Sequence, residues 1–178
     1  MSAQWAVIGG LSLIVAVDSV AIIALTRQIG LLHLKIRPGP QERAVRGPQH
    51  GARLRLDLPP DIQANGSGPG LVLFGFISPH CGGCAAMLPA FADIASRLPA
   101  GERVVLASEA DEARTRAYLT NHGIALPLVT GPHLLRANEI PSTPYAVAAD
   151  LAGTVLAAGP VVTAAQLGDL LRRARSSR

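Results

Sequence analysis

The sequence predicts an α/β protein in which a mixed sheet carries helices on both faces, preceded by one N-terminal transmembrane helix. From Leu71 onward, apolar runs alternate with amphipathic segments, and a connection of hairpin length separates the last two runs. This pattern indicates a mixed sheet with helices between its strands. Residues 5–25 form a 21-residue apolar run with one ionisable side chain, Asp18, and about 20 such residues span a bilayer as a helix.

A cleaved secretory signal is the alternative interpretation of residues 5–25. Such a signal has a basic n-region, a shorter apolar core and a small-residue cleavage site. Residues 1–4 contain no basic side chain, and TRQIGLL follows the run. We therefore expect residues 1–26 to be a retained anchor that contacts the lipid bilayer. A carboxylate at the bilayer centre costs about 2.5 to 3.5 kcal/mol, so Asp18 is expected to be protonated, near the headgroups or facing a partner helix.

Residues 27–69 are predicted to extend the anchor helix and then to form a tether. Three apolar side chains continue one helical stripe before two prolines end it: Ile29, Leu32 and Ile36, then Pro38 and Pro40. The following stretch is rich in Pro, Gly and Arg, which favours a linker. Within it, residues 53–58 alternate charged and apolar side chains, a pattern that predicts one edge strand.

Residues 70–178 are predicted to form the folded domain. The apolar runs predict strands over residues 71–77, 103–108, 126–130, 145–150 and 154–160. The intervening segments predict helices over residues 81–98, 111–123 and 163–175. Gly123 is placed to cap the second helix, and Thr163 is placed to start the third.

The formal net charge is +4, and much of the positive charge lies just after the apolar run. The basic residues of this stretch are Arg27, Lys35, Arg37, Arg43 and Arg46. A basic stretch beside a membrane span is typical of a contact with anionic lipids or of a topology signal. Because the chain has only six aromatic residues, it offers no base-stacking platform, and we expect no nucleic-acid partner.

The two cysteines, Cys81 and Cys84, are three residues apart, and three kinds of site would use them. A structural zinc site normally needs four ligands, but no third cysteine exists, and His122 and His133 are eleven apart, outside the usual spacing. A purely structural disulfide across so short a loop stabilises little. A redox pair fits better, because Cys81 at a helix start has a stabilised thiolate and Cys84, one turn later, can resolve a mixed disulfide. We expect no metal and no cofactor beyond the Cys81–Cys84 disulfide.

From Leu71 to its end, the sequence resembles the thioredoxin-fold thiol–disulfide oxidoreductases. The resemblance rests on FISPHCGGC after an apolar strand, on Pro89 within the helix, and on IPSTPYAVAAD. It implies that Cys81, Cys84 and Pro144 are the catalytic residues, with Thr143–Pro144 as a cis bond that faces the disulfide; Ile140–Pro141 is the alternative. It also implies substrate contacts by Thr143, Pro79 and Tyr145.

Within this superfamily, the chain most resembles the membrane-anchored methylamine-utilisation disulfide proteins. The matching stretches are the N-terminal span, ALTRQIGLLHLKIRPGP, SPHCGGCAAMLP and TPYAVAAD. The resemblance implies a bacterial, single-pass inner-membrane protein that exchanges disulfides with a client such as the small subunit of methylamine dehydrogenase, with a membrane redox partner. A disulfide reductase for cytochrome c maturation and a non-catalytic anchored adaptor are the alternatives. The family implies a periplasmic domain, whereas the positive-inside rule predicts a cytoplasmic one; we adopt the periplasm because a client-folding role needs an oxidising compartment.

Two features depart from these families. Gly75 stands where thioredoxins often carry a buried acid, so the group that deprotonates Cys84 is unassigned. Gly82 and Gly83 stand where the methylamine-utilisation proteins usually have a proline, so the direction of the redox reaction stays open. His80 is either a cation that stabilises the Cys81 thiolate or an exposed loop histidine.

Overall fold

The computed structural model describes Ser19, residues 47–56 and residues 70–177. The chain divides into two compact units, Met1–Ala44 and Val45–Arg178. Of the first unit only Ser19 is described, in a helical conformation, so the predicted anchor and most of the predicted tether lie outside the described residues. Over the described residues, no helix is both long and apolar enough to cross a membrane.

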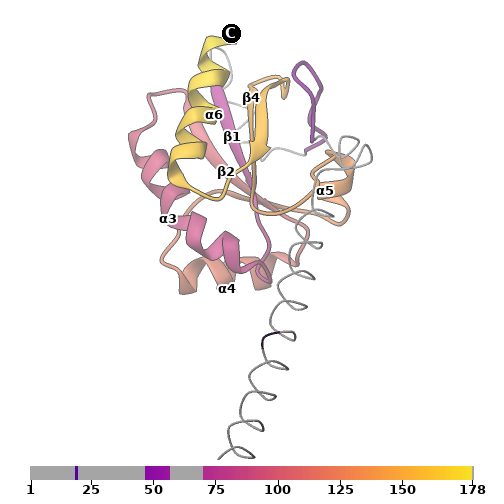
Figure 1. Ribbon diagram of the computed structural model, residues 1–178, viewed down its shortest axis with the longest axis vertical. Helices are drawn as coiled ribbons and strands as arrows, with labels where there is room; N and C mark the ends of the chain where they lie inside the picture. The colour runs from indigo at the N-terminus through magenta and orange to yellow at the C-terminus, as the bar shows by residue number, and fades with distance from the viewer. Residues whose placement is uncertain (1–18, 20–46, 57–69, 178) are drawn as a thin grey trace, which may run out of the picture. The chain divides into compact units, whose positions relative to one another are not determined.

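The second unit contains five strands and four helices in its described part, and Figure 1 shows their arrangement. In chain order they are β1 (Leu71–Phe76), α3 (Gly82–Arg97), β2 (Glu102–Ser108), α4 (Glu112–Asn121), β3 (Leu128–Thr130), α5 (Leu134–Ala137), β4 (Tyr145–Asp150), β5 (Val155–Pro160) and α6 (Ala164–Ser176). Each strand and long helix falls where the sequence pattern predicts it; the short helix α5 was not predicted.

The helix ends follow the expected capping chemistry. The Thr163 side chain accepts from the Gln166 backbone N–H, and the Gln166 side chain in turn accepts from the Thr163 backbone, which completes a capping box at the start of α6. At the end of α4, His122 is the C-cap, and Gly123 follows it with φ +69°, the left-handed conformation that glycine adopts at no steric cost.

The strands form one mixed sheet in the order β3-β2-β1-β4-β5. β1 pairs in parallel with β2, β2 pairs in parallel with β3, and β4 runs antiparallel to both of its neighbours. The parallel pairs are joined through helices, whereas β4 and β5 are joined by a tight turn that contains Gly153. The predicted thioredoxin-like mixed sheet is confirmed.

The core lies on both faces of the sheet, because alternate side chains of β1 point in opposite directions. Leu71 and Leu73 join a cluster formed with α3, α6 and Leu119 of α4. Val72 and Phe74 join a second cluster, to which α5 and residues 52–56 contribute from the other side. Figure 1 shows α3 and α6 over the same face of the sheet, so helices cover both faces as predicted.

The edge strand predicted for residues 53–58 is wrong for the part that is described. Side chains at positions 52, 54 and 56 are half-buried and those between them are exposed, so the predicted alternation is present. The pairing, however, is a single isolated bridge between Arg53 and Thr154. Backbone hydrogen bonds join residues 51–54 to residues 153–155, and the Asn138 side chain then holds Arg55, since it accepts from the Arg55 N–H at 2.7 Å and donates to the Arg55 carbonyl at 3.1 Å.

Candidate active site

Cys81 lies between the end of β1 and the first residue of α3. It is the N-cap residue of that helix, and its sulfur accepts a hydrogen bond from the Cys84 backbone N–H at 3.3 Å. A sulfur in this position replaces one of the missing backbone acceptors of the first helical turn and lies at the positive end of the helix dipole. Both cysteines are free thiols in this structure.

The environment of Cys81 favours its thiolate. Burial raises its pKa, but hydrogen bonds from the side chains of Cys84 and Thr143 and from the backbone N–H groups of Cys84 and Gly83 outweigh burial and hold the pKa below 9.0. The residue is half-exposed, so a partner sulfur can reach it. Cys81 therefore has the properties of an attacking thiol.

Cys84 has the opposite properties. It is 0% exposed. Burial, followed by the hydrogen bond with Cys81, raises its pKa to about 11. At neutral pH this thiol stays protonated until a second event favours its ionisation, which is the behaviour of a resolving cysteine.

The loop before β4 faces the Cys81 sulfur. The Thr143–Pro144 peptide bond is cis, as the sequence resemblance implies, and the Cys81 thiol donates to the Thr143 carbonyl at 3.2 Å. A Cβ atom added to Gly83 would lie 3.5 Å from Cδ of Pro144 and 3.9 Å from Sγ of Cys81. The glycine thus leaves open the space between the nucleophile and this loop.

The two other residues predicted to contact substrate are placed differently. Pro79 is half-buried in the turn before Cys81. Tyr145 is only 4% exposed and packs in the second core cluster. It also borders a surface pocket of about 540 Å³ whose wall includes Pro141 and Ser142. Substrate contact by Pro79 and Tyr145 stays a prediction.

His80 lies in the loop before Cys81, and its side chain contacts Arg114. The side chain is exposed, and its Nε2 lies 3.3 Å from Nη1 of Arg114. Arg114 brings a positive charge beside this loop, and sequence reasoning did not identify it.

Phe91 fills the space where thioredoxins often carry a buried acid. A Cβ atom added to Gly75 would lie 2.8 Å from Cε1 of Phe91 and 2.9 Å from Cδ2 of Leu106. Because real Cβ atoms essentially never come so close, the aromatic ring of α3 and a side chain at this position exclude each other.

Two solved structures have a fold similar to that of this chain. A Chlorobium tepidum protein assigned as the thiol:disulfide interchange protein DsbE superposes with a TM-score of 0.59 at 15% identity, over 74% of this chain and 97% of the other. A thioredoxin-like protein in its oxidised form gives a TM-score of 0.56 at 15% identity, over 75% and 99% of the two chains. The chain therefore has the fold of the thioredoxin class, with two free thiols at the start of α3.

Sequence relatives narrow this class to one family. The methylamine utilization protein MauD of Methylobacillus flagellatus is 31% identical over 150 residues, which cover 77% of this chain and 70% of the relative. MauD of Paracoccus versutus is 28% identical over 159 residues, 86% of this chain and 80% of the relative. No family profile matches the chain. On these similarities, the chain belongs to the MauD family of methylamine utilization proteins.

Proposed function

We propose that this protein is a membrane-tethered thiol–disulfide oxidoreductase that exchanges disulfides with a client protein during the maturation of methylamine dehydrogenase. The observation that carries the proposal is the contrast between the two thiols. An accessible Cys81 has a lowered pKa, and a fully buried Cys84 has a pKa of about 11. The names of the two relatives supply the link to methylamine use.

The proposed reaction is a pair of thiol–disulfide exchanges. The Cys81 thiolate attacks one sulfur of a client disulfide, and the other client sulfur leaves as a thiolate. The Cys84 thiolate then attacks Sγ of Cys81, the bond between Cys81 and the client breaks, and the second client sulfur leaves. The client gains two electrons, and the Cys81–Cys84 disulfide forms. The same steps in reverse transfer the disulfide to a client, and neither direction requires a metal or an added cofactor.

The client is proposed to bind along the Thr143–Pro144 loop. Since the Cys81 thiol reaches the Thr143 carbonyl at 3.2 Å, a client sulfur that replaces this contact brings its own backbone beside the loop. Extended client backbone would then pair with the loop as an added strand. Pro79 and Tyr145 would line this surface, and a disulfide-rich subunit such as the small subunit of methylamine dehydrogenase is the proposed client.

Residues 5–25 are proposed to anchor the protein in the bacterial inner membrane, with the domain in the periplasm. The match to the Paracoccus versutus protein covers 86% of the chain, whereas residues 70–178 are 109 of 178 residues, so the similarity extends into the N-terminal segment. The basic residues after the apolar run favour the opposite orientation. Labelling the thiols of intact cells with a membrane-impermeant maleimide, with and without prior reduction, tests this placement. Labelling only after cell lysis would contradict it.

Trapping of a client tests the catalytic proposal. The Cys84→Ser variant of the full chain is expected to accumulate a mixed disulfide between Cys81 and the client, because the resolving thiol is missing. The Cys81→Ser/Cys84→Ser double variant is the matched control and should trap nothing. Identification of the trapped protein by mass spectrometry tests the client: the small subunit of methylamine dehydrogenase supports the proposal, and an apocytochrome contradicts that part of it. Full maturation activity in the double variant would contradict catalysis and favour an adaptor.

A further inference from the structure

One buried hydroxyl group near the dithiol has no partner. Among the described residues, Tyr118 Oη is the only buried side-chain nitrogen or oxygen that makes no hydrogen bond. Leaving such a group unpaired is unfavourable, so an unpaired group in a native structure needs an explanation. Tyr118 lies on α4 and packs against the core cluster that includes Cys84.

The Cys84 thiolate needs a hydrogen-bond donor to stabilise it, and Gly75, at the position of the usual buried acid, supplies no polar side chain. The thiol must ionise to attack the mixed disulfide, although burial raises its pKa to about 11. Phe91 occupies the place of the buried acid, since a side chain at Gly75 would collide with its ring. Ser108, Thr115 and Asn138 are the buried polar residues of the described part of the chain, and none of them is an acid or a base.

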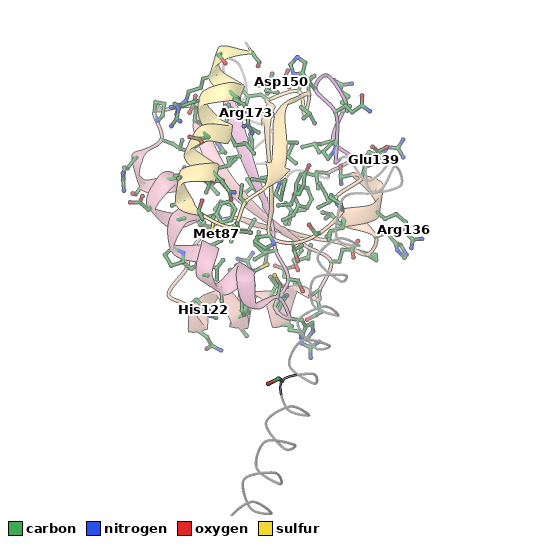
Figure 2. The ribbon with its side chains drawn as sticks, viewed as in Figure 1. Met87, His122, Arg136, Glu139, Asp150 and Arg173 are labelled. Carbon is green, nitrogen blue, oxygen red and sulfur yellow. The ribbon has the colours of Figure 1, made fainter. Side chains whose placement is uncertain are left out.

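The titratable and charged groups around Cys84 are few. The N-terminal side of α3 contributes Cys81, and the preceding loop contributes His80 with its partner Arg114. α4 contributes Tyr118, whose ring lies tilted against that of His122 with 4.6 Å between centroids; Figure 2 labels His122 at the end of α4. β1, β4 and α6 contribute apolar side chains to this cluster.

More distant charged groups do not serve this role. Glu102 pairs with Arg175 and lies beside Leu71, at the end of β1 that is opposite to Cys81. Asp93 of α3 is exposed and pairs with Arg97 in the next turn. Tyr118 is therefore the one buried hydrogen-bond donor, among the described residues, that is unused and shares the cluster of the resolving cysteine.

We propose that the Tyr118 hydroxyl donates a hydrogen bond to the Cys84 thiolate, directly or through one buried water, as that thiolate attacks the mixed disulfide. This inference rests on the proposed function. The Cys84 proton leaves to solvent water, and Tyr118 keeps its own proton. The Cys84 sulfur forms a bond with Sγ of Cys81, and the bond between Cys81 and the client breaks with its electron pair on the client sulfur, which then takes up a proton.

The electrostatics of the tyrosine agree with this role. Burial raises the pKa of Tyr118, and negative charge on Cys84 and on Cys81 raises it further. The hydroxyl thus interacts electrostatically with both sulfurs. It also remains a protonated donor over the pH range in which the exchange runs.

The experiment separates the two exchange steps in the reduced full-length chain. With excess 5,5′-dithiobis(2-nitrobenzoate), Cys81 attacks first and releases one thionitrobenzoate; Cys84 then resolves the mixed disulfide and releases the second. Stopped-flow absorbance across pH gives a rate and a pH midpoint for each phase. A hydrogen bond to a charged group is worth about 1.5 to 3 kcal/mol. Tyr118→Phe is therefore expected to slow the second phase at least about tenfold at pH 7 and to raise its midpoint by at least about one unit, with the first phase unchanged.

Thr115→Val is the matched control, since it removes a buried hydroxyl one turn earlier on α4. That hydroxyl donates to the Asp111 carbonyl at 2.9 Å, so the control should lower the melting temperature and leave the second-phase midpoint unchanged. Tyr118→Phe removes a hydroxyl without a partner and should keep the melting temperature. A wild-type midpoint in Tyr118→Phe, or an equal shift in both variants, would overturn the inference while leaving the proposed function intact. Absence of the second phase from the wild-type protein would overturn the proposed function itself.

Discussion

Alkylation of the reduced protein at pH 7 is expected to modify Cys81 first and Cys84 hardly at all. Iodoacetamide reacts with the thiolate, so the first modification divides between the two residues in proportion to their ionised fractions. With a pKa of about 11, Cys84 is ionised in about one molecule in 10⁴ at pH 7. Cys81, with a pKa below 9.0, is ionised in more than about one in 10². The structure thus predicts at least about a hundredfold preference for Cys81, which the full burial of Cys84 increases.

The assay is single-hit alkylation followed by fragment-ion mass spectrometry, which separates two cysteines of one peptide. As the pH rises, the preference should hold until the Cys81 profile levels off, and it should then fall about tenfold per pH unit until Cys84 ionises at about pH 11. The Cys81→Ser variant is the control. The remaining thiol, Cys84, should react at pH 7 at least about tenfold more slowly than Cys81 of the wild-type protein. Burial, the larger cause of the raised pKa of Cys84, is unchanged in this variant. Equal labelling of both residues in the wild-type protein at pH 7 would refute the assignment of nucleophile and resolving thiol.

Three further substitutions test how the fold supports the site. Gly75→Ala should destabilise the protein by about 1 to 3 kcal/mol in urea unfolding, because the new methyl group would lie 2.8 Å from the Phe91 ring; an unchanged midpoint would contradict the close packing. Gly82→Ala adds the same methyl group where nothing lies within 4 Å, so it should stabilise by about 0.4 to 1 kcal/mol, and a destabilisation there would show that the first turn of α3 is strained. Asn138→Ala should cost about 1 to 3 kcal/mol and speed hydrogen exchange at the Arg55 amide, which donates to this side chain. An unaltered exchange rate at the Arg55 amide would show that its hydrogen bond to Asn138 does not protect it.

The arrangement of the core explains how one helix serves both packing and chemistry. α3 buries Met87, labelled in Figure 2, and Leu88 against the sheet, while its N-terminus presents Cys81 at the surface. The sulfur of Cys84 lies one turn in, on the buried side. Cys81 lies at the helix N-terminus and is partly exposed, whereas Cys84 lies one turn further along the helix and is buried, so their different pKa values follow from the position of α3 on the sheet.

The sequence by itself determined the features that depend on neighbouring residues. The apolar runs located β1, β2, β4 and β5, since a strand covered on both faces requires a continuous apolar segment. The spacing of Cys81 and Cys84 after β1 located the dithiol at a helix start. The resemblance to the thioredoxin fold implied a cis proline, and the strand directly after Thr143–Pro144 favoured the bond that is cis in the structure.

Only the tertiary structure decided the contacts between distant segments. Nothing in the local pattern shows that Asn138 holds Arg55, 83 residues away, or that Arg114 reaches His80. The unpaired hydroxyl of Tyr118 is likewise visible only after α4 packs beside the dithiol. The physical reason is that periodicity and capping act over a few residues, whereas strand order and helix packing bring together residues whose separation along the chain carries no signal.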